Sequence, residues 1–290
     1  MPPRFMERMQ RQSEVYRSVY EKPSNFDPPP YPFSRSRAES TTSRASDTSS
    51  LASQRSRTSA PPPAYQSQSQ SKVCPVEDPS LPRNSLVLVT GASTFQGTHI
   101  CDQLLEHGYR VRGVVPNPER AVTTAKFFLD KYGAGRYTTA IIPNTVPREA
   151  FHIAAKTCSG IIHVPEESEF KPDPTVAIAP MLASAINALE AAAKETTVRR
   201  FVYCSSATAA GNAGNGRRSK VTADSWNTAA FLAAWEPPPY TIDRAWAVYA
   251  AGKMQTEQAV WRWHRDRRPN FVLNCGAYCT ATPSHEGSIS

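Results

Sequence analysis

Tyr249 and Lys253 are the two side chains whose types and spacing most directly suggest chemistry. Residues four apart lie on one face of a helix. An ammonium group close to a phenol stabilises the phenolate, so the tyrosine can exchange a proton with a carbonyl or alcohol oxygen. Ser206, which follows a short apolar segment, can hold the same oxygen by a hydrogen bond. The alternative interpretation is an amphipathic helix whose lysine stem lies along its apolar side.

A glycine-bearing turn earlier in the chain is the second candidate site. The apolar run at 86–89 has β-branched members and predicts a strand that is buried on both faces. Gly91 breaks the run, and Gly97 opens a helical pattern that places Ile100, Leu104 and Leu105 on one face. A helix N-terminus after such a turn binds anions, and a dinucleotide pyrophosphate is the usual occupant. Thr94 stands where a middle glycine is expected, so a purely conformational role for the glycines stays open.

Strand-like and helix-like segments alternate after this turn. Short apolar runs predict strands at 109–116, 137–142, 160–164, 200–204 and 271–274. Helical patterns predict helices at 118–132, 148–157 and 174–194, and Gly108 is expected to cap the first helix. The alternation predicts an α/β fold of the Rossmann type, a doubly wound parallel sheet with helices on both faces.

Residues 1–82 differ in composition from the rest and are dominated by Ser, Pro, Arg, Gln and Thr. Such a segment cannot bury enough apolar surface to offset its ordering entropy, so we predict a disordered tail before one domain at 83–290. The tail arginines are spread among serines, which favours a solvated tail and no nucleic-acid partner despite a net charge of +8.

Two tail segments, 28–31 and 62–65, match the motif PPxY. Polyproline segments of this kind dock in the aromatic grooves of WW domains, so we predict a WW-domain partner that contacts Tyr31 and Tyr65. Chance occurrence in a proline-rich tail is the alternative. A third match at 237–240 falls within the predicted domain and indicates a rigid loop.

The cysteines and the apolar segments favour a cytoplasmic protein. The six cysteines show no paired spacing typical of a disulfide framework or a zinc site. Cys101, Cys158 and Cys204 lie in apolar contexts that are typical of reduced core residues. We expect no run that is long and apolar enough to span a membrane, no secretory signal and no bound metal.

The residues after the second predicted strand bear on the choice of dinucleotide. An acid there holds the ribose 2′-hydroxyl of NAD, and a basic residue accepts the 2′-phosphate of NADP. Pro116 and Asn117 are neither, whereas Arg120 follows close by, next to Glu119. We therefore expect NADP rather than NAD, with a solvated surface role for Arg120 as the alternative.

The chain resembles the extended short-chain dehydrogenase/reductase family (NAD-dependent epimerase/dehydratase superfamily) in the motifs TGASTFQG, GIIHV, NALEAA, RRFVYCSSATAA and VYAAGK. Within that family it is most similar to fungal aldehyde or ketone reductases and dihydroflavonol-reductase-like enzymes. The resemblance implies an NAD(P)-dependent oxidoreductase acting on a small carbonyl or alcohol. Ser206 would orient the substrate oxygen, Tyr249 would be the acid–base group, and Lys253 would hold the nicotinamide ribose.

The resemblance also implies a set of cofactor-binding residues: Gly91, Ser93, Thr94, Phe95, Gly97, Arg120, Asn144, Val164, Tyr249 and Lys253. Asn187 resembles a helix asparagine that supports a proton relay in many members. Pro165 and Glu166 depart from the small residues that are expected after the fourth strand. The family's C-terminal substrate lobe is expected to be incomplete. A catalytically impaired dinucleotide-binding scaffold or regulator therefore remains an alternative, and an epimerase or dehydratase is a third.

Overall fold

The computed structural model describes residues 78–165, 170–211, 221–222 and 224–278. The predictions for the disordered tail and for Tyr31 and Tyr65 lie outside these residues. So do Glu166 and residues 279–290.

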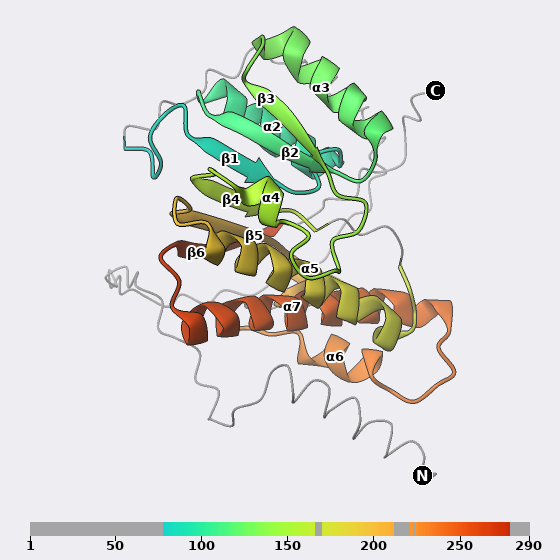
Figure 1. Ribbon diagram of the computed structural model, residues 1–290. Helices are drawn as coiled ribbons and strands as arrows, with labels where there is room; N and C mark the ends of the chain where they lie inside the picture. The colour runs from blue at the N-terminus through green and yellow to red at the C-terminus, as the bar shows by residue number, and fades with distance from the viewer. Residues whose placement is uncertain (1–77, 166–169, 212–220, 223, 279–290) are drawn as a thin grey trace, which may run out of the picture. The chain divides into compact units, whose positions relative to one another are not determined.

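Six parallel strands form one sheet in the order β3-β2-β1-β4-β5-β6 (Figure 1). This order confirms the predicted doubly wound fold, with the crevice for a ligand expected outside the carboxyl ends of the strands, where the order reverses between β1 and β4. The strands are β1 Leu86–Val89, β2 Arg110–Val115, β3 Tyr137–Ile141, β4 Gly160–His163, β5 Arg200–Ser206 and β6 Val272–Tyr278.

Two layers of helices cover the sheet, and the side chains of β1 divide between the two cores. Leu86 and Leu88 pack in the core that α4, α5 and α7 close, whereas Val87 and Val89 pack in the core that α2 and α3 close. This alternation explains why the whole strand is apolar. The helices are α2 Phe95–Glu106, α3 Pro118–Tyr132, α4 His152–Ala155, α5 Pro174–Lys194, α6 Thr228–Ala234 and α7 Ala245–Arg267, with the 3-10 turns η1 Ala207–Ala209 and η2 Ile242–Arg244.

Some predicted boundaries were wrong for local physical reasons. The helix expected at 148–157 is only α4, because Glu149 has a φ of 70° and cannot belong to a right-handed helix. The fifth strand continues through Ser205 and Ser206, since its backbone pairing with β6 does not depend on apolar side chains. The first helix begins at Phe95, two residues before Gly97, because Thr94 caps it.

Helix α5 bears on the expectation that no run could cross a membrane. By its length and mean hydropathy alone, this helix could cross a membrane. The expectation was therefore wrong as far as length and hydropathy are concerned. The helix buries Ile178, Leu182 and Leu189 in the protein core and packs along α7 (Figure 1). A core helix of this kind passes the same test, so the finding is weak evidence for a membrane span.

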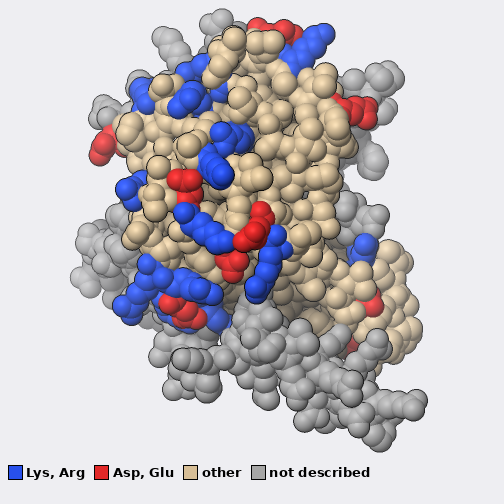
Figure 2. All heavy atoms as spheres, viewed as in Figure 1, with Lys and Arg blue, Asp and Glu red and all other residues tan. Residues whose placement is uncertain are grey.

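Charges of both signs mingle on the face of the molecule seen in Figure 2. Lysine and arginine side chains lie among aspartate and glutamate side chains there, and that face carries no continuous basic surface. The expectation that no nucleic acid binds stays a prediction.

We predict that Gly97→Ala destabilises the fold. A Cβ at residue 97 would lie 1.9 Å from the carbonyl oxygen of Gly91, and that atom belongs to the backbone of the turn. Overpacking of this kind costs about 2 kcal/mol or more. Urea unfolding measures the loss, with Gly211→Ala as the matched control, because a Cβ there meets nothing closer than 4.0 Å. Equal unfolding free energies for the two variants would contradict the close packing of this turn.

Candidate functional site

The turn between β1 and α2 is held by Thr94. Its hydroxyl accepts a hydrogen bond from the Gly97 amide at 3.0 Å and donates one to the Gly91 carbonyl at 2.8 Å. Thr94 has a φ of −80°, so this position does not require a glycine, whereas Gly91 has a φ of 60°. The departure from the expected glycine pattern thus leaves the turn intact and adds a cap to the helix.

This turn has the properties of an anion-binding site. The N-terminus of α2 carries no acidic residue in its first turn, so its positive dipole is not neutralised locally. The buried hydroxyl of Ser93 has no hydrogen-bond partner among the residues that the structure describes. An unpaired buried donor beside a helix N-terminus fits a phosphate group. Phe95, also predicted to bind the cofactor, is 84% exposed at the start of the helix.

Arg120 lies beside the same turn. Asn117 caps α3 by accepting a hydrogen bond from the Arg120 amide, which fixes the backbone from which the arginine extends. The Arg120 guanidinium donates to the carbonyl oxygen of Ser93 at 3.3 Å. The side chain is therefore directed at the glycine turn, although it comes from the next βα unit.

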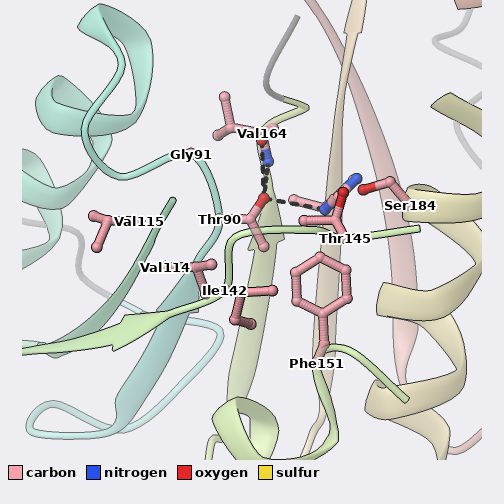
Figure 3. Close-up of a pocket in the computed structure, with 10 residues that line it drawn as sticks. Thr90, Gly91, Val114, Val115, Ile142, Thr145, Phe151, Val164 and Ser184 are labelled. Atoms are coloured by element: carbon pink, nitrogen blue, oxygen red, sulfur yellow. Dashed lines mark hydrogen bonds between the residues drawn. The ribbon is translucent and has the colours of Figure 1, made fainter. Parts of the chain in front are cut away.

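A pocket opens at the carboxyl ends of the strands, close to the turn (Figure 3). Val164 lines it, together with Thr90, Gly91 and Thr145. Asn144 is exposed instead, and its side-chain oxygen accepts a hydrogen bond from the Val146 amide at 3.0 Å. In this loop it is Thr145 that lines the pocket, and cofactor binding by Asn144 stays a prediction.

Asn187 holds the loop that carries Thr145. From the middle of α5, its amide nitrogen lies 2.9, 2.8 and 2.9 Å from the carbonyl oxygens of Thr145, Val146 and Pro147. The hydrogens of this buried amide are therefore directed at backbone carbonyls of the pocket loop. This arrangement is a structural clamp on the pocket loop, and a part for Asn187 in a proton relay stays an expectation from the resemblance.

Tyr249 and Lys253 lie one turn apart on α7, as their spacing predicted. Lys253 is only 4% exposed, and its Nζ lies 5.7 Å from the centre of the Tyr249 ring. Tyr249 also contacts the rings of Phe170 and Trp246, at centroid distances of 5.0 and 5.5 Å. A buried ammonium group thus lies next to a phenol that is part of an aromatic cluster.

Ser206 is buried at the end of β5 and begins η1. Its Oγ accepts hydrogen bonds from the Thr208 amide at 3.3 Å and from the Thr208 hydroxyl at 2.9 Å. Both lone pairs are used in this way, so the Ser206 hydrogen is oriented toward another acceptor.

The neighbouring Ser205 connects this strand end to α7. Its hydroxyl donates to a carboxylate oxygen of Glu257 at 2.5 Å, and Glu257 lies one turn beyond Lys253. Sequence analysis did not single out Glu257, although its spacing of four from Lys253 placed it on the same helix face. Among the described residues, no three His, Cys, Asp or Glu side chains gather to hold a metal ion.

The fold and this site define a class of protein, and comparison with known families identifies it. The family model for the NAD dependent epimerase/dehydratase family matches residues 87–276. The chain belongs to this family. The match runs from Val87 in β1 to Gly276 in β6 and includes the glycine turn and the Tyr249–Lys253 pair.

Individual relatives agree with this membership. The chain is 41% identical over 194 residues to the NAD-dependent epimerase/dehydratase terH of Aspergillus terreus, across 67% of this chain and 57% of that relative. It is 33% identical to aldehyde reductase 2 of Sporidiobolus salmonicolor, across 69% of this chain and 58% of the relative. The chain thus spans less than two thirds of the length of these relatives.

A solved structure shows the same fold. Yeast methylglyoxal/isovaleraldehyde reductase Gre2, crystallised with NADPH, matches with a TM-score of 0.55 and 21% identity, over 66% of this chain and 56% of that one. At this identity the likeness concerns the fold alone.

We predict that Asn187→Asp destabilises the protein more than Asn187→Ala at neutral pH. Alanine removes the amide donor from the carbonyls of Thr145 and Val146, whereas the Pro147 carbonyl still accepts from the Ala150 amide. The loss costs about 1–3 kcal/mol, and a carboxylate adds repulsion from these oxygens. Protonation gives the substituted carboxyl a donor again, so its folded-state pKa is raised and the deficit shrinks as the pH falls. Urea unfolding of both variants at neutral and acidic pH measures this, with Asn144→Ala as an exposed control. A deficit for Asn187→Asp that grows on acidification would contradict the clamp.

Proposed function

We propose that this protein is an NAD(P)-dependent oxidoreductase that reduces an aldehyde or ketone, or oxidises the corresponding alcohol. The observation that carries the proposal is the buried Lys253 ammonium beside the Tyr249 phenol on α7. The sheet supplies a phosphate-type turn, with its unpaired Ser93 hydroxyl, at the carboxyl ends of its strands. Relatives named aldehyde reductase and ketoreductase support the reaction class.

In the proposed mechanism the nicotinamide cofactor supplies or accepts the hydride when it is bound. During reduction, Tyr249 donates its phenolic proton to the substrate oxygen. During oxidation, the Tyr249 phenolate accepts a proton from the alcohol of the substrate. Lys253 stabilises the negative charge that the phenol oxygen then carries, and it holds the nicotinamide ribose. Ser206 donates its oriented hydrogen to the substrate oxygen and so fixes that oxygen close to Tyr249.

The cofactor would be held by the turn from Gly91 to Gly97, with Ser93 and the α2 N-terminus at its phosphates. We propose NADP rather than NAD, because Arg120 reaches the turn and no acidic side chain follows β2 directly.

One alternative has support among the relatives. The relatives terH and tndE carry the name epimerase/dehydratase, so a reaction without net oxidation remains a second candidate. A cofactor-binding scaffold without turnover is a third candidate, proposed from the sequence. The WW-domain partner of Tyr31 and Tyr65 is a proposal from the sequence alone.

We predict that Tyr249→Phe lowers kcat by about 10²–10⁴-fold while NADPH affinity changes little. Phenylalanine keeps the ring contacts with Phe170 and Trp246 and removes only the transferable proton. The measurement is NADPH consumption with a panel of aldehydes and ketones, and Tyr109→Phe is the control, since that hydroxyl bonds Leu81 before β1.

Wild-type protein that binds NADPH without turning over any of these substrates would favour the scaffold. Turnover by Tyr249→Phe at the wild-type rate would exclude Tyr249 as the acid–base group.

We predict that Arg120→Ala weakens NADPH binding about tenfold and leaves NADH binding nearly unchanged. The guanidinium is the basic group that the structure places at the turn, and only NADPH carries a 2′-phosphate. Titration of both cofactors checks this, with Arg110→Ala as the control at the opposite end of β2. An equal loss for both cofactors would show that Arg120 supports the turn rather than the 2′-phosphate.

A further inference from the structure

Trp246 and Phe170 form a half-exposed aromatic pair beside Tyr249. Trp246 is 49% exposed and Phe170 is 55% exposed, and their rings stack at a centroid distance of 5.9 Å with planes inclined by 16°. Both rings also contact the Tyr249 ring, at centroid distances of 5.5 and 5.0 Å. Exposed apolar side chains that adjoin one another mark a binding surface, whereas single ones need no explanation. The pair therefore indicates a surface that receives a ligand.

The pair lies on the open side of the proposed acid–base group. Trp246 precedes Tyr249 by one turn of α7, and Phe170 comes from the segment that joins β4 to α5. Exposure falls along this face of the helix, from the half-exposed Trp246 through the partly exposed Tyr249 to Lys253, which is 4% exposed. The buried ammonium lies 5.7 Å from the centre of the Tyr249 ring. A molecule that reaches the phenol from solvent is therefore expected to lie against Trp246 and Phe170.

The surface of the pair is apolar and rich in π electrons. The nearest cation along α7 is Arg244, two positions before Trp246. Its guanidinium donates to the carbonyl oxygens of Glu236 and Pro237 at 2.7 and 3.1 Å and lies over the Tyr240 ring, so it is engaged away from the pair. A saturated group on this surface gains only from burial of its apolar area. A planar aromatic group gains from burial and also from ring stacking.

We propose that Trp246 and Phe170 are specificity-determining residues that bind a planar aromatic substituent of the substrate. The inference rests on the function proposed for Tyr249 and names the class of substrate: aldehydes or ketones whose carbonyl carries an aryl group. Trp246 is the centre of the surface, because the planes of Phe170 and Tyr249 are inclined to its plane by only 16° and 30°. The aryl group stacks on this surface, and its carbonyl then lies beside the phenol.

Kinetics with two aldehydes of similar size test the proposal. The measured quantity is the ratio of kcat/KM for benzaldehyde to kcat/KM for cyclohexanecarbaldehyde. We expect Trp246→Leu and Phe170→Leu each to lower this ratio about threefold to tenfold, because leucine keeps apolar bulk and removes the ring. Trp246→Phe keeps a ring and should stay within about twofold of wild type. Differences in intrinsic reactivity, and any general loss of activity through Tyr249, cancel when the ratios of variant and wild type are compared.

Phe127→Leu is the matched control. Phe127 is 50% exposed and contacts another ring, that of Phe128 at 5.0 Å, but it lies on α3 at the other face of the sheet. Its ratio should equal that of wild type. An unchanged ratio in both Trp246→Leu and Phe170→Leu would overturn the proposal. Sedimentation of the same variants tests a different occupant: a dimer that Trp246→Leu alone dissociates would assign the pair to contact between two copies and overturn it as well.

Binding of an unreactive analogue tests the surface without turnover. Benzamide and cyclohexanecarboxamide are titrated into the protein with NADPH present, and the indole N–H signal of Trp246 is identified by its loss in Trp246→Leu. We expect benzamide to shift this signal and to bind at least about threefold more tightly than cyclohexanecarboxamide. No shift, or equal affinity for the two amides, would overturn the inference. Benzamide binding at Trp246 without turnover of any carbonyl would refute the proposed function and leave aromatic recognition standing.

Discussion

The hydroxyl of Thr90 holds β1 to β4 at the point where the sheet must open. The backbone amide of Thr90 donates to the carbonyl of Ile162. The Thr90 hydroxyl then hydrogen-bonds both the backbone amide and the backbone carbonyl of Val164. The order of strands reverses at this place, so the helices that follow β1 and β4 leave in opposite directions. The crevice between these helices depends on the Thr90 hydroxyl, which links β1 to β4 at the point where their backbone hydrogen bonds end. The turn, the pocket and His163 are all arranged around this one side chain.

The parts of the fold that could be predicted from the sequence are those that local periodicity encodes. Helices at 118–132 and 174–194 were correct to the residue, because their apolar positions and N-terminal Pro and cap residues lie within one segment. The prediction of a helix at 148–157 was wrong, because no residue pattern in that segment indicates that Glu149 adopts a left-handed backbone conformation.

The candidate site divides in the same way. The turn at Gly91–Gly97 and the pair Tyr249–Lys253 are local patterns, so sequence analysis could name them. Other residues near the site have partners that are far away in the sequence. Thr145 contacts Asn187, 42 positions away, Glu257 contacts Ser205, 52 positions away, and His163 contacts Thr90, 73 positions away. Such partners are set by the register of strands and helices, which one sequence does not display. Asn187 was singled out by resemblance, and only its contacts reveal that it clamps a loop.

The close crossing of α5 and α7 explains how a lysine can be buried beside the sheet. A Cβ on Gly252 would lie 2.8 Å from the Sδ of Met181, so a larger residue would require the Met181 side chain to shift. Ala251, which packs in the same cluster as Ile178 and Leu182 of α5, is fully buried. Lys253 is therefore buried with its helix, and its ammonium lies 5.7 Å from the centre of the Tyr249 ring.

The cap that Thr94 makes has a further consequence for how a ligand is received. A glycine in its place would leave the turn with many conformations, and an arriving phosphate would have to select one of them. With the Thr94 hydroxyl bonded to both Gly91 and Gly97, the turn keeps a single shape before anything binds. The entropic cost of ordering the loop has then already been met during folding, so an anion meets a preorganised receptor. The Gly97 amide is bonded to Thr94 and is therefore not available to a phosphate, whereas the remaining amides of the turn are held in fixed positions.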